Sequence, residues 1–383
     1  MVKRMVLFFL VLAAILTTGC WDKIEIERRA FIQVIALDKI PEEERTDQNS
    51  RYVASFVFPN TAMLGAQGGE YGSGGGGEAS VTISITGRTL SQCAYLMSTR
   101  LERVVYFNQA RIMLFGKELM KDRQLVRETV DKLARDFRLN RRMYVGVVDG
   151  MARDVLKVKP KVDQLIVGYL TGLFEDELDP ARVRTMEAGE YLAAMREGGD
   201  LIMPKLTPYT DEVKVAGGAI IKDHRLIGWL GEQESVMSLL LEDEFDSGIF
   251  EVLYKDALVT YDVFDAKRKI KYEGEQNGWL KFTISVDVEG NLAEFVLGEE
   301  LFDSKVIAHI EGLINKKIEK GTRDVLYKYQ CHYKMDGIGL NEFLFKYHPR
   351  VWQRVKNNWE QVFCEALITV ESDAKIRRIG MIK

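Results

Sequence analysis

The sequence predicts an α+β protein with two or three mixed domains. The chain has 383 residues, of which 46% are hydrophobic, so it can bury a sizeable core and exceeds the usual length of one domain. Strand-like and helix-like segments alternate in the N-terminal half, which predicts a sheet layered with helices. In the C-terminal half, strands joined by short polar turns precede two long helices, so we expect a largely antiparallel sheet packed with long helices.

The first twenty residues predict export. Lys3 and Arg4 precede twelve unbroken apolar residues and then small residues before Cys20, the pattern of a secretory signal peptide at 1–19. Twelve helical residues reach about 18 Å, short of the ~30 Å hydrocarbon layer of a membrane. A cysteine directly after small residues looks like a bacterial lipobox, in which the Cys20 sulfur carries a diacylglyceryl lipid. Thr17 stands where lipoboxes usually have leucine, and the alternative is an ordinary signal peptide with an incidental cysteine.

The N-terminal half, 20–199, is predicted to hold five strands and four helices. β-Branched and aromatic residues mark the strands, and apolar residues spaced three and four apart mark the helices. Eight glycines within 65–78 predict a long exposed loop, and a strand rather than a helix follows them, so they do not form a dinucleotide-binding fingerprint. The predicted strands are 31–37, 51–58, 81–86, 111–115 and 143–148, and the predicted helices are 89–101, 117–137, 162–174 and 181–195.

Glycines and prolines after residue 197 predict a domain boundary. Gly198, Gly199, Pro204 and Pro208 interrupt the periodicity, so we expect a linker at 200–212 and a second domain at 213–383. This domain is predicted to open on a hairpin and to close on a strand that begins near residue 366. Its predicted strands are 213–221, 226–230, 250–264, 269–273 and 280–288, and its predicted helices are 233–241, 299–320, 322–333 and 351–363.

Composition and motifs lean away from nucleic-acid binding, metal chemistry and nucleophilic catalysis. The formal net charge is −4, without the clustered basic excess that binding to phosphate requires. Four histidines, four cysteines and no C-x-x-C spacing leave little material for a transition-metal site. No G-x-S-x-G elbow occurs, and His309 lies on an apolar helix where a core position is expected. We therefore expect no enzyme, cofactor or metal.

Three smaller patterns have structural interpretations. The acidic run 242–246 lacks the ligand spacing of a calcium loop and is predicted to be a solvated face. Arginines in the segment 138–142 could lie near lipid headgroups, at about 1 kcal/mol each, although a charged loop rim is the simpler interpretation. Three cysteines follow the anchor, Cys93, Cys331 and Cys364; we expect buried free thiols, with a disulfide between the last two left open.

Several segments in order along the chain resemble the Ger(x)C family, the C subunits of bacterial spore germinant receptors. The resemblance starts at the mature N-terminus with Cys20, Trp21 and Asp22, followed by the stretch 34–38. It continues through 87–90, 217–220 and 225–230. Towards the C-terminus it rests on Asp336, Gly337, Gly339, Pro349, Trp352 and Trp359, and on 376–380.

The resemblance implies a lipoprotein on the outer face of the spore inner membrane. It implies assembly with a membrane A subunit and a transporter-like B subunit into a nutrient receptor, with no enzymatic activity and no nucleic-acid partner. Recognition of the nutrient is attributed mainly to the membrane subunits, so the expected role is receptor assembly and germination signalling. The eight residues named above, from Trp21 to Trp359, are the structural or interaction candidates, and Cys20 is the lipidation site.

Two other function classes stay open. A solute-binding lipoprotein that delivers a ligand to a transporter would fold as two lobes with parallel strands, unlike the turn-linked strands predicted after residue 213. A cell-envelope hydrolase would need an acid pair or a metal cluster, and none can be assigned. Trp352 and Trp359 are seven residues apart on one predicted helix face with Val355, which indicates core anchors rather than a sugar-stacking platform.

Overall fold

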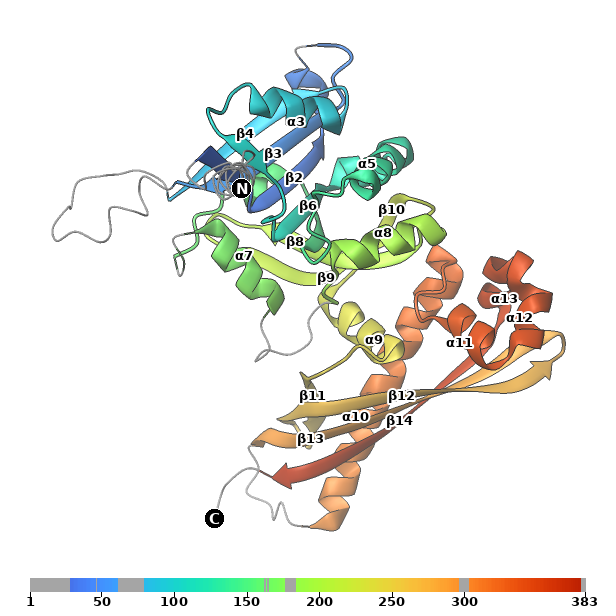
Figure 1. The fold of residues 1–383 in the computed structure, drawn as a ribbon. Helices are drawn as coiled ribbons and strands as arrows, with labels where there is room; N and C mark the ends of the chain where they lie inside the picture. Colours follow the sequence, from blue (N-terminus) through green and yellow to red (C-terminus); the bar gives the residue numbers. More distant parts are fainter. Residues whose placement is uncertain are drawn as a thin grey trace, which may run out of the picture.

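The computed structural model describes residues 28–45, 47–60, 79–161, 163, 165–175, 184–295 and 303–379. The leader, the lipidation candidate Cys20, the candidates Trp21 and Asp22, and the glycine-rich segment 65–78 lie outside the described residues. The described chain forms an α+β fold of two main sheets, as the sequence predicts (Figure 1).

The first sheet has eight strands in the order β10-β9-β8-β7-β6-β2-β3-β4. Strands β2, β6, β7 and β8 run parallel to their neighbours in the centre, and the outer pairs are antiparallel. Strands β1 and β5 form a separate two-stranded parallel sheet. The bounds are β1 Arg29–Phe31, β2 Val34–Lys39, β3 Tyr52–Pro59, β4 Ser80–Gly87, β5 Val104–Tyr106, β6 Ile112–Gly116, β7 Tyr144–Val148, β8 Leu201–Pro208, β9 Val213–Lys222 and β10 Arg225–Leu230.

Helices cover both faces of this sheet, which explains why every residue of the central strand β6 is buried. One face packs against α3, α4, α5 and α8, and the other against α6 and α7 (Figure 1). The bounds are α3 Leu90–Ser98, α4 Lys117–Lys121, α5 Arg123–Arg135, α6 Ala152–Val155, α7 Ile166–Glu175 and α8 Ala188–Glu197.

The prediction of a linker at 200–212 is wrong, because most of this segment is strand β8 in the interior of the first sheet. Its prolines are compatible with a strand: the register with β9 shifts between Pro204 and Leu206, and Pro208 is the last residue. The hairpin β9–β10, predicted to open the second domain, also belongs to this sheet. The first sheet therefore extends to Leu230.

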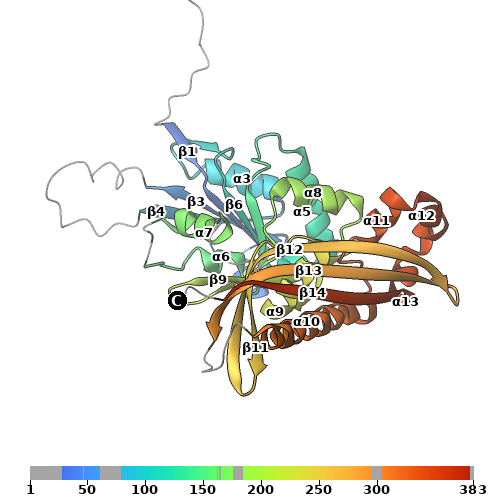
Figure 2. The same ribbon diagram turned by 90° about the horizontal axis from the view of Figure 1, so that it is seen from below.

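The second sheet has the order β11-β12-β13-β14, and its largely antiparallel character is confirmed. The last strand departs from this pattern, since β14 pairs with β13 in parallel. Long helix α10 packs on one face, and Figure 2 shows it beneath the curved strands. The bounds are α9 Glu232–Glu242, β11 Gly248–Tyr254, β12 Ala257–Gln276, β13 Trp279–Phe295, α10 Ser304–Tyr327, α11 Leu340–Tyr347, α12 Pro349–Val355, α13 Trp359–Glu365 and β14 Leu367–Ile379.

Six predicted segments are divided or joined in the structure. The helix predicted at 117–137 is divided at Asp122, whose carboxylate caps α5 by accepting from Leu125 N at 3.2 Å. The two helices predicted at 299–333 form α10, which runs on through Thr322 into a π-helical turn. Lys255 and Asp256 turn the strand predicted at 250–264 into a hairpin, and β12 continues through 269–273. A 3-10 turn divides the helix predicted at 351–363 into α12 and α13.

Two predictions of buried side chains are wrong. His309 is exposed on α10, where its ring contacts the ring of Tyr254 at 5.3 Å. Of the three cysteines predicted to be buried thiols, only Cys93 is fully buried, Cys364 is half-buried and Cys331 is exposed. All three are free thiols, so the disulfide that the sequence left open does not form.

Candidate functional site

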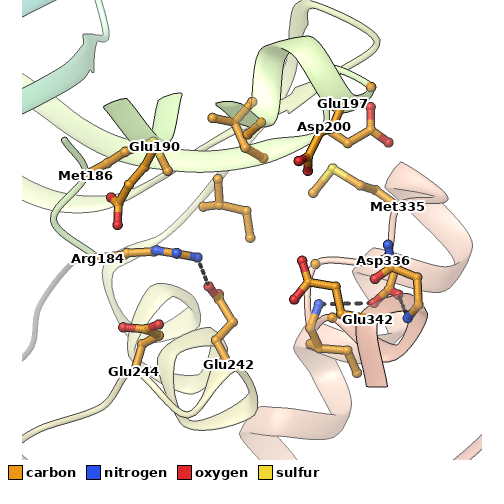
Figure 3. A pocket seen from close by; sticks show the side chains of 18 of the residues that line it. Arg184, Met186, Glu190, Glu197, Asp200, Glu242, Glu244, Met335, Asp336 and Glu342 are labelled. Carbon is orange, nitrogen blue, oxygen red and sulfur yellow. Dashed lines mark hydrogen bonds and ion pairs between the residues drawn. The ribbon is translucent and has the colours of Figure 1, made fainter. Parts of the chain in front are cut away.

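A cavity of about 490 Å³ lies where the two sheets meet. In Figure 3, residues of α8 and β8 of the first sheet lie above the cavity, and residues of α9 and of the segment before α11 lie below it. Arg268 of β12 also lines the cavity. Seven acidic side chains and two arginines are among the residues that line it. They are Glu190, Glu197, Asp200, Glu242, Glu244, Asp336 and Glu342, with Arg184 and Arg268.

Glu242 ends α9 and is deeply buried, with a side chain only 7% exposed. It accepts hydrogen bonds from Ser238 Oγ and from Arg184 Nη1, the latter at 3.2 Å across the junction (Figure 3). Burial raises the pKa of Glu242, and the hydrogen bonds from Ser238 and Arg184 offset part of that rise. The run 242–246 was predicted as a solvated face; its first residue instead forms an ion pair between the two halves.

Arg268 of β12 joins the end of α9 to the segment before α11. Its guanidinium donates to the carbonyl oxygen of Leu241 and, at 2.6 Å, to that of Ile338. Its own backbone N–H donates to the Asp243 carboxylate at 2.7 Å. Burial lowers the pKa of Arg268, while the nearby carboxylates favour its charge. A cation at the last carbonyls of a helix is favourable because the helix dipole is negative there.

Asp336 anchors the start of α11. Its carboxylate accepts from the backbone N–H groups of Ile338, Leu340 and Asn341 at 3.3, 3.1 and 2.8 Å. A fourth donor is Trp359 Nε1, at 3.1 Å. Burial raises the pKa of Asp336, although all four N–H donors favour the carboxylate. The carboxylate therefore takes the place of a capping side chain, since the N-cap residue itself is a glycine.

The two candidate glycines of this segment are required by geometry. A Cβ on Gly337 would lie 2.8 Å from Cζ of Tyr329, too close for a real contact. Gly339 has a φ of +76°, a left-handed conformation that other residues adopt only with strain. The buried Tyr329 hydroxyl lies 2.6 Å from Ser238 Oγ, so these glycines also seat the segment against α9.

The remaining candidates lie beside this segment without lining the cavity. Pro349 is the first residue of α12, a position that tolerates its missing N–H. Trp352 of α12 and Trp359 of α13 meet edge to face, with ring centroids 5.5 Å apart. Both are half-buried against the C-terminal core and do not lie on one continuous helix. Trp359 thus has a specific partner in Asp336 that sequence spacing could not reveal.

The site combines predicted and unpredicted residues. Asp336, Gly337 and Gly339 line the cavity, as does the first acid of the run 242–246. Arg184 and Arg268 were missed, because isolated arginines carry no pattern before the fold brings their partners close. Among the residues that the structure describes, no group of three or more metal-ligating side chains is placed to hold a metal ion, and no helix is long and apolar enough to cross a membrane.

Comparisons with known proteins give a consistent result over almost the whole chain. Residues 22–208 match the family model described as the spore germination protein N-terminal domain, and residues 216–380 match the model described as spore germination B3/GerAC-like, C-terminal. In Bacillus subtilis (strain 168), spore germination protein YndF is 27% identical, covering 97% of this chain and 96% of that protein. Spore germination protein B3 of the same strain is 26% identical, covering 99% and 98%.

A solved structure has the same fold. The crystal structure of the GerBC protein aligns with a TM-score of 0.60 at 20% sequence identity, covering 90% of this chain and 96% of that chain. This similarity supports the α+β arrangement of two sheets described above.

Proposed function

The chain belongs to the Ger(x)C family of spore germination proteins, and from that membership we propose that it is the lipid-anchored C subunit of a germinant receptor. The observation that carries the proposal is the order of the two family models, which together follow the chain from residue 22 to residue 380. In this proposal Cys20 carries a diacylglyceryl lipid, and the folded chain lies on the outer face of the spore inner membrane beside the A and B subunits.

The junction supports a role in assembly and signalling rather than catalysis. The Asp336 carboxylate accepts hydrogen bonds from four N–H donors of the same chain. The Glu242 carboxylate accepts hydrogen bonds from Ser238 and Arg184. Groups engaged in this way are not presented to a substrate, and the ion pair between Arg184 and Glu242 also links the two halves. The proposed subunit therefore acts as a rigid adaptor that transmits changes in the membrane subunits.

Replacement of the anchoring cysteine tests the proposal. Spores that carry Cys20→Ala in place of the wild-type chain are expected to lose this chain from the inner-membrane fraction and to germinate slowly with the nutrient of this receptor. Loss of absorbance of the spore suspension measures germination, and immunoblots of membrane fractions measure attachment. Cys331→Ala is the matched control, because Cys331 is an exposed free thiol in the folded part. Normal germination of Cys20→Ala spores, with the chain in the soluble fraction, would contradict the proposal.

The cavity at the junction is the one observation that favours ligand binding by this chain. It lies between two halves, as the site of a solute-binding lipoprotein does, and its volume of about 490 Å³ could admit a small molecule. Calorimetric titration of candidate amino acids and sugars at ~0.1 mM protein would detect a site of 1 μM affinity, worth about 8 kcal/mol. We expect no saturable binding; one-to-one binding at that affinity would favour the solute-binding alternative.

A further inference from the structure

Six arginines lie along one edge of the first sheet, which we call the arginine edge. The parallel strands β2, β6 and β7 all begin at this edge. Two of the arginines are at β1, one directly precedes β6, and three lie in the loop between α5 and β7. The arginine edge consists of Arg28, Arg29, Arg111, Arg138, Arg141 and Arg142.

Backbone contacts make these three segments neighbours. Arg111 N donates to Gln33 O at 2.8 Å, which joins the start of β6 to the residue before β2. Tyr144 N donates to Arg111 O at 2.8 Å, which joins the start of β7 to the same point. Asn140 Nδ2 donates to Ala110 O at 3.0 Å, so the loop 136–142 is held against the segment before β6.

Ring contacts join β1 and the loop to the end of β5 and the residue that follows it. The Arg29 guanidinium lies 5.0 Å from the ring centroid of Tyr106, and the Arg138 guanidinium lies 5.7 Å from that of Phe107. Tyr106 and Phe107 are consecutive, so the two arginines belong to one continuous surface.

The edge presents exposed cations and an exposed aromatic ring, beside the carboxylates of Asp136 and Glu187. Phe137, between Asp136 and Arg138 in the loop, is 91% exposed. Among the described residues, the six arginines form one ion pair, between Arg138 and Asp136 at 3.2 Å. The whole chain carries a net charge of −4, so this edge is opposite in sign to the average of the molecule.

The path of the chain places the proposed anchor on this side. Arg28 is eight positions after Cys20, and eight residue steps reach at most about 29 Å when fully extended. In Figure 2, β1 lies on the opposite side of the molecule from β11 and α10. A lipid at Cys20 therefore keeps the start of β1 within about 29 Å of the membrane, which favours an orientation with the β1 side towards the lipid.

We infer that the arginine edge, with Phe137 at its tip, is the face that rests on an anionic lipid surface. The inference rests on the proposed anchor at Cys20 for its orientation. Arginine guanidinium groups bind lipid phosphates in a bidentate way, and an exposed phenylalanine inserts at the boundary of headgroups and acyl chains. The acidic remainder of the chain is repelled by the same surface, which favours a single orientation.

Vesicle co-sedimentation tests this surface without the anchor or the other subunits. The probe is the mature chain lacking only Cys20, mixed with phosphatidylcholine vesicles with and without about 30% phosphatidylglycerol. We expect binding to the anionic vesicles that falls between 0.05 and 0.5 M salt, because salt screens exposed charges. The variant Arg138→Gln/Arg141→Gln/Arg142→Gln is expected to bind about 10- to 100-fold more weakly, since each basic residue near such a surface is worth about fivefold (~1 kcal/mol).

Two further variants test whether an effect comes from the arginine edge itself, and not from the change in net charge or from a loss of folding. Lys267→Gln/Lys269→Gln/Lys271→Gln removes the same three charges from exposed positions of β12, and is expected to bind as wild type. Phe137→Ser changes no charge and is expected to bind at least about fivefold more weakly through lost apolar burial. Thermal denaturation checks that each variant is folded.

Three results would overturn the inference. In the first, the β12 variant binds vesicles as weakly as the arginine variant. In the second, the wild-type protein does not bind anionic vesicles. In the third, the wild-type protein binds a polyglutamate peptide in place of vesicles, which would favour an acidic protein partner. The assay is independent of germination. Failure to bind vesicles together with a germination defect of Cys20→Ala contradicts this inference alone, and vesicle binding together with normal germination contradicts the proposed function alone.

Discussion

Asp336 has a structural role that its sequence context only partly predicts. The resemblance of the segment 336–340 to a known family identified the position. An aspartate is required at this position because its carboxylate accepts hydrogen bonds from four N–H donors. One of these donors, Trp359, is 23 residues further along the chain. A hydrogen bond over that separation depends on the packing of α11 to α13 and has no local signal.

Asp336→Ala should destabilise the protein strongly. Four N–H donors would lose their acceptor, and α11 would lose its cap, so we expect a loss of about 2 to 4 kcal/mol in the free energy of unfolding. Urea denaturation measures the loss. Asp246→Ala, at an exposed position, is the control and is expected to change stability by less than about 0.5 kcal/mol. Equal effects of the two substitutions would show that Asp336 is not a cap.

Asp38 is a second buried carboxylate that caps a helix. Its two oxygens accept from Ala152 N at 2.7 Å and Arg153 N at 3.0 Å, at the start of α6. Burial raises its pKa to about 6, although both backbone N–H groups favour the charged form. The native state therefore holds a proton on Asp38 at pH values where the unfolded chain has lost it.

The stability contributed by Asp38 should fall as the pH rises from 4 to 7. A native pKa above the unfolded value means that the folded state binds more protons, and the difference corresponds to roughly 3 kcal/mol. Asp38→Asn should remove this slope, as measured by urea denaturation at a series of pH values. The pKa of Asp136 is shifted in the opposite direction. Burial would raise this pKa, but the hydrogen bonds from Arg138 and Lys132 lower it to about 2. The stability contributed by Asp136 should therefore rise between pH 2 and pH 4, and Asp136→Asn should remove that rise. Parallel profiles of wild type and Asp38→Asn would refute the assignment.

At the scale of elements, periodicity predicted most helices and strands but not their connections. Alternation in 81–86 and the apolar run 111–115 correspond to β4 and β6. The prolines of 200–212 were misleading because proline is excluded from a strand only where the ladder requires a backbone N–H donor. The register of β8 with β9 shifts next to Pro204, so no donor is required there. The division of 117–137 at Asp122 likewise depends on a cap rather than on hydrophobic spacing.

Two glycines in helical regions should respond in opposite ways to alanine. Gly339→Ala places a side chain at φ +76° and is expected to cost about 1 to 2 kcal/mol. Gly312→Ala lies inside α10 with open space around the new Cβ, and is expected to stabilise by about 0.5 to 1 kcal/mol. Differential scanning calorimetry compares the two melting temperatures. A stabilising Gly339→Ala would mean that the turn before α11 is not left-handed in solution.

On the scale of the whole molecule, the hydrophobic core of the second sheet extends into the first sheet. Ile202, Ile220 and Leu230 of the first sheet belong to the same buried cluster as α9 and the second sheet. At the rim of this contact, Tyr333 Oη donates to Trp229 O at 3.2 Å. Residue spacing could not predict this continuity, because it places β8 in a linker and β9 and β10 in the second domain.

Wild-type protein should therefore unfold in a single cooperative transition, and Gly228→Ala should divide it. A Cβ on Gly228 would lie 2.3 Å from Cε1 of Tyr333, so the ring must leave its place at the junction. We expect a loss of about 1 to 3 kcal/mol and two separated calorimetric peaks. Gly172→Ala, where the new Cβ meets open space in α7, is the matched control. A single peak at the wild-type temperature for Gly228→Ala would exclude this coupling.

The parallel position of β14 affects how the protein is made. This strand is the last to emerge from the ribosome, yet its partner β13 ended at Phe295, 72 residues before β14 begins. Until Leu367 and the residues after it are synthesised, β13 is an edge strand with unpaired N–H and C=O groups, open to pairing with other chains. A chain cut short by a premature stop codon after α13 would keep all its helices and still aggregate. Translation to the end of β14 is therefore a condition for a soluble product.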